Sequence, residues 1–189
     1  MPSLQRFKLF FASVALALSP LAQAAVFGQV QPDQSKIGFT FEQMGVQMDG
    51  QFRQFEAQLQ FDPEQPTQGF AKFQVELASV SLGSPEFDQE VIGKDWFNVK
   101  SFPRAEFVST DIKALKDDRY EVTGVLTIKG QSQTITVPTT FRSEGNKGIF
   151  EGEFTLERGS FKIGEGSWSK FDIVANNVVV RFQITALPK

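Results

Sequence analysis

The sequence predicts an all-β fold, in which about eight antiparallel strands follow one another in up-and-down order, with one short helix. Apolar side chains alternate with polar ones in many short runs, which is the period of a strand with one buried face. Clusters of Gly, Pro, Asn and Asp separate these runs, and several connections are short enough for hairpins. A sandwich and a barrel both satisfy this alternation, while the short hairpins favour an up-and-down order.

The N-terminus has the pattern of a secretory leader. Arg6 and Lys8 precede the apolar run Leu9–Leu18, and the small-x-small site Ala22-Gln23-Ala24 follows it. The apolar run is too short to span a bilayer. We therefore expect residues 1–24 to be a cleaved Sec signal peptide and the mature protein to act in the periplasm. An uncleaved anchor is the alternative.

Composition limits what the mature chain can do. Its 189 − 24 = 165 residues suit a single domain, residues 25–189. Without the two basic residues of the leader, 17 basic and 22 acidic residues give a net charge of 17 − 22 = −5. This balance disfavours nucleic acid and anionic membrane surfaces as partners. Cys and His are both absent, which excludes disulfides, thiol chemistry, Ser-His triads and His-ligated metals.

The first predicted strands lie between residues 37 and 77. One run places three apolar side chains on one face: Ile37, Phe39 and Phe41. Residues 50–61 form the next run, in which an extra residue near Arg53-Gln54 predicts a β-bulge that restores the inward parity. A third run presents Phe73, Val75 and Leu77.

A helix is predicted over Pro85–Ile92. Ser84 is a favoured N-cap residue, Pro85 fits the first turn, and Gly93 fits the C-terminal cap. A helix between strands is well placed to lie against one opening of a barrel. The loop that follows, Asp95–Pro103, carries three aromatic side chains: Trp96, Phe97 and Phe102.

Five more alternating runs complete the predicted sheet. They cover residues 105–109, 120–128, 135–141, 150–156 and 178–186. Pro138 has no N–H to donate to a neighbouring strand, so it predicts an edge or a bulge within its run. Turn-rich segments join several of the runs: 116–118, 129–131 and 144–148.

Three motifs resemble those of the YceI-like family. The segment Trp96-Phe97-Asn98, followed by Ser101–Thr110, resembles its central motif. Gly124–Gly130 is similar to its G-x-L-T-I-x-G hairpin. Arg158–Gly164, with Trp168 beyond it, resembles its R-x-x-F-x-I-G segment. The three occur in the family's order and extend the resemblance over almost the whole mature chain.

This resemblance implies a lipocalin-like antiparallel barrel in the periplasm that holds a polyisoprenoid or similar lipid in an internal tunnel. It implies no enzyme activity and no cofactor, and dimers are common in such proteins. Many members carry His in the first strands, whereas this chain has Asp33–Lys36 there. Any function that this His has in other family members therefore cannot be assigned to this chain.

Phenylalanine is the abundant aromatic residue, with 21 Phe against one Tyr in the whole chain. Because Phe has no polar group, these rings are suited to dry surroundings. They either pack a solid core or line a tunnel, and the family resemblance favours the tunnel. The predicted ligand-binding residues are Phe41, Phe52, Phe55, Phe73, Trp96, Phe97, Phe107, Leu126, Phe154, Arg158 and Phe182.

Arg158 is the one charged residue in that set. The parity of the preceding run points it inward, where it would clamp a diphosphate or donate to a quinone carbonyl. One alternative is a structural ion pair with Asp172 or Glu106. Another is that Gly159 begins a bulge and leaves Arg158 in solvent.

The remaining signals for chemistry are weak. Glu86, Asp88, Glu90 and Asp95 form one acidic cluster, but their spacing matches a solvated helix face better than a metal or acid–base site. No phosphate-binding loop or nucleophile motif occurs. We therefore expect neither a catalytic residue nor a metal.

Three functional hypotheses follow. The first is a lipid carrier that sequesters a polyisoprenoid, quinone or fatty chain. The second is an enzyme that modifies such a lipid with Asp or Glu, which requires a carboxylate inside the tunnel. The third is an interaction module with a filled core that serves an inner-membrane redox partner. Homodimers are compatible with all three.

Overall fold

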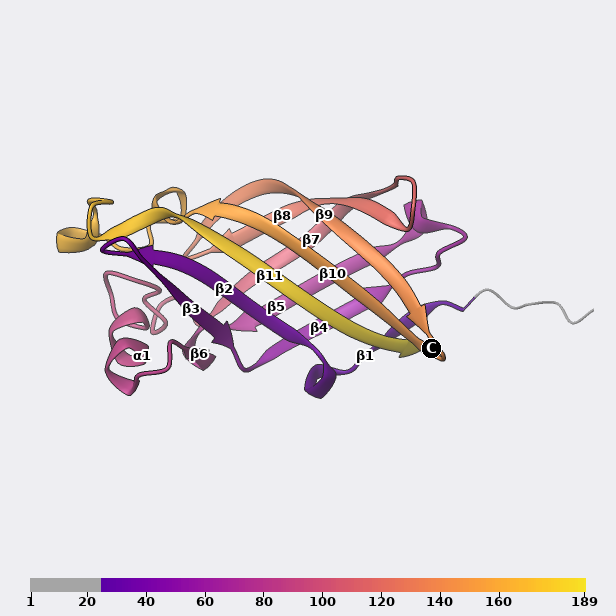
Figure 1. Ribbon diagram of the computed structural model, residues 1–189, viewed down its shortest axis with the longest axis horizontal. Coiled ribbons are helices and arrows are strands. Elements are labelled where there is room, and N and C mark those ends of the chain that lie inside the picture. Colours follow the sequence, from indigo (N-terminus) through magenta and orange to yellow (C-terminus); the bar gives the residue numbers. More distant parts are fainter. Residues whose placement is uncertain (1–24) are drawn as a thin grey trace, which may run out of the picture.

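The computed structural model describes residues 25–189, so the predicted leader peptide lies outside the described residues. This part of the chain forms one curled antiparallel sheet with an α-helix beside one end, as Figure 1 shows. The strands are β1 (Phe27–Val30), β2 (Lys36–Gln43), β3 (Val46–Phe52), β4 (Phe55–Gln60), β5 (Phe70–Glu76), β6 (Val80–Ser81), β7 (Arg104–Ala114), β8 (Arg119–Ile128), β9 (Gln131–Glu144), β10 (Lys147–Glu157) and β11 (Val174–Pro188). The α-helix is α1 (Pro85–Val91), and short 3₁₀ turns span Pro32–Gln34, Pro66–Gln68, Leu77–Ser79, Arg158–Phe161 and Gly166–Trp168.

The sheet curls until its two ends meet. The hydrogen-bonded order is β4-β5-β7-β8-β9-β10-β11-β2-β3-β6, and β1 pairs with β11 beside this path. The two ends join because β3 runs on into β4 after only Arg53 and Gln54. Backbone bonds between Phe27 and Phe61, at 2.8 and 2.9 Å, close the same seam further along. The all-β antiparallel prediction is therefore confirmed.

The predicted strand count is corrected from about eight to ten along the hydrogen-bonded path. Two features explain the difference on this path: one predicted run is divided in two, and the short strand β6 follows β5 without a signal in the sequence. The turn Pro32–Gln34 separates β1 from β2, and Leu77–Ser79 separates β5 from β6. The run predicted over residues 50–61 breaks at Arg53-Gln54, where the sequence predicts a bulge, and becomes parts of β3 and β4.

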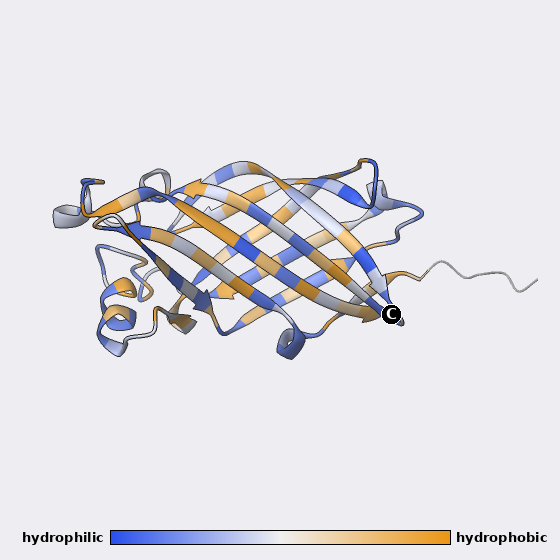
Figure 2. Ribbon diagram, viewed as in Figure 1, coloured by the Kyte–Doolittle hydropathy of each residue, from blue (hydrophilic) through white to orange (hydrophobic). Residues whose placement is uncertain are grey.

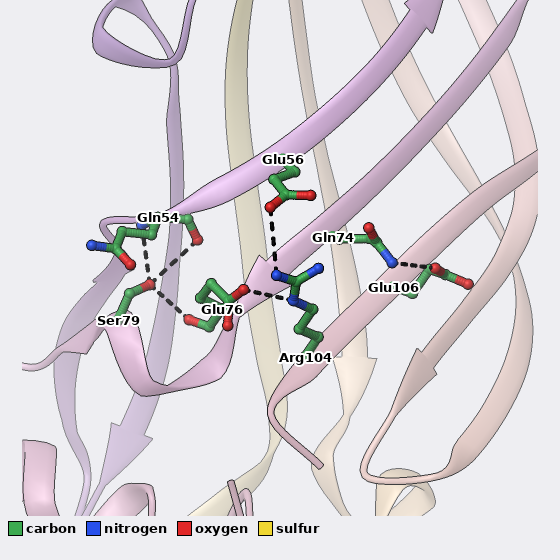
Figure 3. Close-up of polar contacts among 7 residues, drawn as sticks. All are labelled: Gln54, Glu56, Gln74, Glu76, Ser79, Arg104 and Glu106. Carbon is green, nitrogen blue, oxygen red and sulfur yellow. Dashed lines mark hydrogen bonds and ion pairs between the residues drawn. The ribbon is translucent and has the colours of Figure 1, made fainter.

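Side chains of the neighbouring turn hold this break, as Figure 3 shows. Ser79 Oγ accepts the backbone N–H of Gln54 at 3.0 Å and donates to the carbonyl of Glu76 at 2.7 Å. Beside it, Arg104 bridges Glu76 at 2.6 Å and Glu56 at 3.4 Å. These polar contacts tie β4, β5 and β7 together across the outer face of the sheet.

Pro138 lies where β9 loses one of its neighbours. β9 pairs with β8 from Gln131 to Thr140, but with β10 only from Thr139 to Glu144. The ladder between β9 and β10 thus ends next to the residue that has no N–H to donate. This confirms the predicted edge.

The helix is close to the prediction. α1 ends at Val91, one residue before the predicted end. Ser84 occupies the N-cap position, but its side chain makes no capping hydrogen bond, and Asp88 instead accepts the backbone N–H of Leu82 at 2.6 Å. Within residues 25–189, no helix is long and apolar enough to cross a membrane.

The interior of the sheet divides into two ends with different packing. Figure 2 shows apolar and polar residues alternating along the strands, which directs one set inward. The β1 end is packed by a buried cluster that includes Phe27, Phe61, Tyr120, Phe141, Phe150 and Ile184. The α1 end is packed by a second cluster that includes Leu77, Val80, Phe97, Leu126, Leu156 and Phe161. An internal space lies between them.

Candidate ligand cavity

The curled sheet encloses a cavity of about 550 Å³. This volume lies within the range of about 300–1,000 Å³ that small-molecule sites occupy. Its wall is built mainly from apolar side chains of β2, β3, β5 and β7–β11, joined by α1 and the loops at the α1 end. A solid core, which the interaction-module hypothesis requires, would leave no such space.

Ten of the eleven predicted ligand-binding residues lie on the cavity wall: Phe41, Phe52, Phe73, Trp96, Phe97, Phe107, Leu126, Phe154, Arg158 and Phe182. Most of these rings are half-buried, because they face the space rather than other atoms. Phe55 is the exception. Its ring packs against Phe73, with centroids 6.4 Å apart, and it is Phe73 that lines the cavity at this place.

Some wall residues were missing from the predicted set. Phe39 lies between Phe41 and Phe52, with ring centroids at 6.1 and 5.4 Å from theirs. Phe39 is two residues from Phe41 in the same strand and therefore points to the same face, so the sequence was sufficient to predict its place on the wall. Trp168 also lines the cavity, but it belongs to a 3₁₀ turn, where no strand period indicates a direction.

Phe rings and glycines face each other across the strands of the wall. A Cβ at Gly50 would meet the ring of Phe39, and a Cβ at Gly152 would meet the ring of Phe182. Each pair lies directly opposite in register, Phe39 with Gly50 and Phe182 with Gly152. The rings can therefore lie flat over backbone instead of filling the interior, which helps to keep the cavity open.

The cavity opens beside α1. Only three of its lining residues are exposed, namely Glu86, Phe87 and Glu90, and all three belong to this helix. The prediction that the helix lies against one opening is consistent with this placement.

Arg158 adopts none of the three predicted arrangements. Its side chain is 1% exposed, so it is not in solvent, and no carboxylate of residues 25–189 lies within ion-pair distance. Its nitrogens donate, at 2.8–3.2 Å, to six backbone carbonyls, those of Ile163, Gly164, Trp168, Lys170, Val174 and Ala175. Six acceptors use every N–H of a guanidinium, so none remains for a ligand. Arg158 is a positioning residue for the segment 159–174.

Aromatic rings surround the same guanidinium. Its carbon lies 5.5 Å from the ring centre of Trp96 and 4.9 Å from that of Phe171. Trp96 also packs on Trp168, with centroids 5.4 Å apart, and its indole N–H is buried without a partner. Burial in these apolar surroundings lowers the pKa of Arg158, although an arginine keeps its charge at any ordinary pH.

Lys129 is a second buried cation at the α1 end. Its ammonium group donates to the carbonyl of Lys162 at 2.7 Å and to the carboxylate of Glu165 at 2.8 Å. The hydrogen bond from Lys129 is the main reason that the pKa of Glu165 lies below its ordinary value. Lys129 and Arg158 thus hold one segment from two sides.

Three carboxylates belong to the wall. Glu86 and Glu90 lie at the opening, and Glu106 comes from β7. The Glu106 carboxylate lies on the outer face of the sheet, where it accepts from Lys72 at 2.9 Å and from Gln74 at 2.8 Å. The bond from Lys72 is the main cause that lowers its pKa. None of these placements sets two carboxylates around the apolar interior, and within residues 25–189 no three metal-ligating side chains are grouped.

Comparison with known protein families gives a match to the YceI-like domain over residues 29–186. A UPF0312 protein of Pseudomonas putida is 32% identical over 145 residues, which cover 72% of this chain and 71% of that protein. A UPF0312 protein of Photorhabdus laumondii is 30% identical over 110 residues, 58% of this chain and 57% of that protein.

Solved structures share the fold. BcnA of Burkholderia cenocepacia is 39% identical, with a TM-score of 0.82 over 84% of this chain and 99% of that chain. A polyisoprenoid binding domain from Saccharophagus degradans is 13% identical, with a TM-score of 0.67 over 88% of this chain and 100% of that chain. At that identity the likeness concerns the fold alone.

Proposed function

This chain belongs to the YceI-like family, and we propose that it sequesters or carries one long apolar lipid, a polyisoprenoid, quinone or fatty chain, inside its cavity. The observation that carries the proposal is the apolar space of about 550 Å³ at the centre of the sheet. When a hydrocarbon chain enters such a space, apolar surface of both the ligand and the protein is removed from water, and this drives binding. The Saccharophagus degradans domain is known as a polyisoprenoid binding domain, which agrees with this class of ligand.

The place of action belongs to the same proposal. The leader pattern of residues 1–24 supports export, and we propose that the protein binds its lipid in the periplasm. Sequencing the N-terminus of exported protein tests this, and we expect the mature chain to begin at Ala25. Recovery of Met1 or Pro2 from exported material would contradict it.

Binding rather than catalysis is the activity that the cavity supports best. Glu86 and Glu90 are exposed at the opening, and the Glu106 carboxylate is held by Lys72 and Gln74. A general acid or base has to reach the reacting group of a bound lipid. No wall carboxylate is placed deep in the apolar interior, where the chain of such a lipid would lie.

The direct test is to purify the protein gently from its native host, extract it with solvent and analyse the extract by mass spectrometry. We expect one class of long-chain lipid in stoichiometric amount. Val180→Trp adds bulk to the wall of β11 and should abolish retention. Val179→Trp makes the same change at the next residue, which is absent from the wall, and should retain the lipid. Equal lipid in both variants, or none in the wild type, would overturn the proposal.

A further inference from the structure

The charges on the cavity wall restrict the ligand more narrowly than its apolar surface does. Four charged residues belong to the wall: Glu86, Glu90, Glu106 and Arg158. The carboxylates of Glu86 and Glu90 lie at the opening, and that of Glu106 lies on the outer face of the sheet. Arg158 is the only cation that the described part of the chain contributes to the wall. Whether an anionic group can bind therefore depends on Arg158.

Arg158 has no donor left for a ligand. Its N–H groups are all used by six backbone carbonyls between residues 163 and 175, and its side chain is 1% exposed. The other buried cation of the α1 end, Lys129, is not on the wall and is bonded to Glu165 and to the carbonyl of Lys162. An anion inside the cavity would find no free positive partner.

The carboxylates add repulsion to this lack of a partner. Glu86 and Glu90 are one helical turn apart on α1, so both meet a ligand as it passes the opening. The Glu106 carboxylate takes no part in this repulsion, because it lies on the outer face of the sheet, where it accepts from Lys72 and Gln74. The uncharged polar groups of the wall belong to Gln43, Tyr120 and Thr139 and to the indoles of Trp96 and Trp168. Burial raises the pKa of Tyr120, so its hydroxyl stays neutral at ordinary pH.

The geometry points to a ligand whose head group is uncharged, such as an alcohol, a quinone or an amide, and to the exclusion of diphosphates, phosphates and free fatty acids. Arg158 acts in this selection by being unavailable, and Glu86 and Glu90 act by repelling anions at the opening. This inference rests on the proposed lipid-binding function and names the class of lipid. Charged groups lose most of their hydration on burial, so an unpaired one binds far more weakly than its neutral counterpart.

The test uses three probes that share one prenyl tail: geranylgeraniol, geranylgeranyl diphosphate and geranylgeranylamine. Binding to the delipidated full chain is measured by competition at fixed ionic strength. We expect the alcohol to bind at least about 100-fold more tightly than the diphosphate, since burial of an unpaired charge is costly. The amine is expected to bind more weakly than the alcohol for the same reason. A diphosphate or an amine that binds as tightly as the alcohol overturns the inference.

Charge reversal at the opening tests the residues themselves. E86K/E90K should lower the ratio of the Kd of the diphosphate to the Kd of the alcohol by about tenfold, because the opening then attracts anions. E64K/D111K makes the same change in net charge at exposed positions that are not on the wall and serves as the control. If both variants narrow the ratio equally, net charge alone explains it and the assignment to the opening is wrong.

The outcomes separate this inference from the function on which it rests. If none of the three probes binds, the proposed lipid-binding function fails. If all three bind with similar affinity, lipid binding stands and the selection for an uncharged head group is wrong. Salt sharpens the distinction, because screening should raise the affinity of the diphosphate for the wild type while leaving that of the alcohol nearly constant.

Discussion

The two ends of the barrel are built from the same residue type but packed in different ways. At the β1 end, Phe61 is 3% exposed and contacts Tyr120, Phe141 and Phe150 with each ring centroid 5.2 Å away. Towards the α1 end, Phe39 and Phe52 are half-buried and face the cavity. Rings fill space where several strands direct them at one point, as around Phe61, whereas the ring of Phe39 lies over the backbone of Gly50 and leaves the space beside it open.

The two ends are also closed by different forces. Backbone hydrogen bonds between Phe27 and Phe61 close the seam at the β1 end, as in any sheet. At the α1 end, loops close the barrel, and two buried cations, Arg158 and Lys129, hold them through backbone carbonyls. The β1 end is therefore closed by the sheet itself, whereas side chains hold the loops at the end where the cavity opens.

The same substitution at the two ends gives the largest expected contrast. Phe61→Asp places a carboxylate among three rings at a position that borders the cavity but is only 3% exposed, and the unpaired charge should prevent folding. Phe154→Asp faces the cavity, where the carboxylate keeps some water, so the protein should fold but lose its lipid.

Melting temperature and co-purified lipid measure the two effects separately. Thr155→Asp, at the exposed neighbour of Phe154, is the matched control and should change neither. If Phe154→Asp also fails to fold, the cavity is packed like a core and the comparison between the ends is wrong. If it folds and keeps its lipid, Phe154 does not line the site.

Arg158→Met tests the cations that close the α1 end. The substitution leaves buried carbonyls without donors, each worth about 1–3 kcal/mol, so we expect a loss of about 4 kcal/mol in the free energy of unfolding. Arg158→Lys keeps a charge but offers fewer donors, so its free energy of unfolding should lie between those of the wild type and Arg158→Met.

Hydrogen exchange shows where the Arg158→Met effect acts. Amides of the segment 159–174 should lose protection, while those around Phe27 and Phe61 at the β1 end should keep theirs. Uniform loss of protection over both ends would show that the α1 end is not a separate unit.

The sequence predicted the strands of this fold better than its site. Alternation alone identified the runs of β7–β11 and the inward parity of Phe107, Leu126, Phe154 and Phe182, because a strand has a fixed period of two. Ten of eleven predicted wall residues follow from that parity and from one loop motif. The division of the run over residues 50–61 into two strands depends on tertiary contacts such as Ser79 with Gln54, which no local pattern encodes.

The role of Arg158 could not be predicted from the sequence for a related reason. Its partners are backbone carbonyls from a segment without regular strand structure, and every residue type has a carbonyl. An inward arginine therefore suggested a ligand or a carboxylate as its partner. Phe55 shows the converse error, since its inward parity was correct but the ring of Phe73 occupies the wall.

Acid should weaken the α1 end through Glu165. Its pKa is lowered in the folded protein, mainly by the hydrogen bond from Lys129, so the stabilisation is present above the unfolded pKa and is lost as pH falls through the folded value. We expect stability to decline below about pH 4.3, the ordinary pKa of a glutamate, and Glu165→Gln to flatten that part of the profile. Because Glu165 is exposed, the effect is small and should shrink in salt. Midpoints of urea unfolding between pH 3 and 6 measure this effect. Identical pH profiles for the wild type and Glu165→Gln would contradict it.

The smallest expected effect concerns the break between β3 and β4, where the chain bends around the cavity. Ser79→Ala removes the acceptor of the Gln54 N–H and the donor to the Glu76 carbonyl, while leaving the backbone path unchanged. A net loss of about 1 kcal/mol is expected, because both backbone groups lie near the surface and water replaces much of what is lost. Ser132→Ala, which removes one exposed bond to Thr127 in the regular ladder of β8 and β9, is the control and should cost less. If Ser79→Ala costs no more than Ser132→Ala, then the bend is set by strand pairing alone. In that case backbone hydrogen bonds would hold both ends of the barrel. At the α1 end these would be the bonds of β3 with β6 and of β4 with β5.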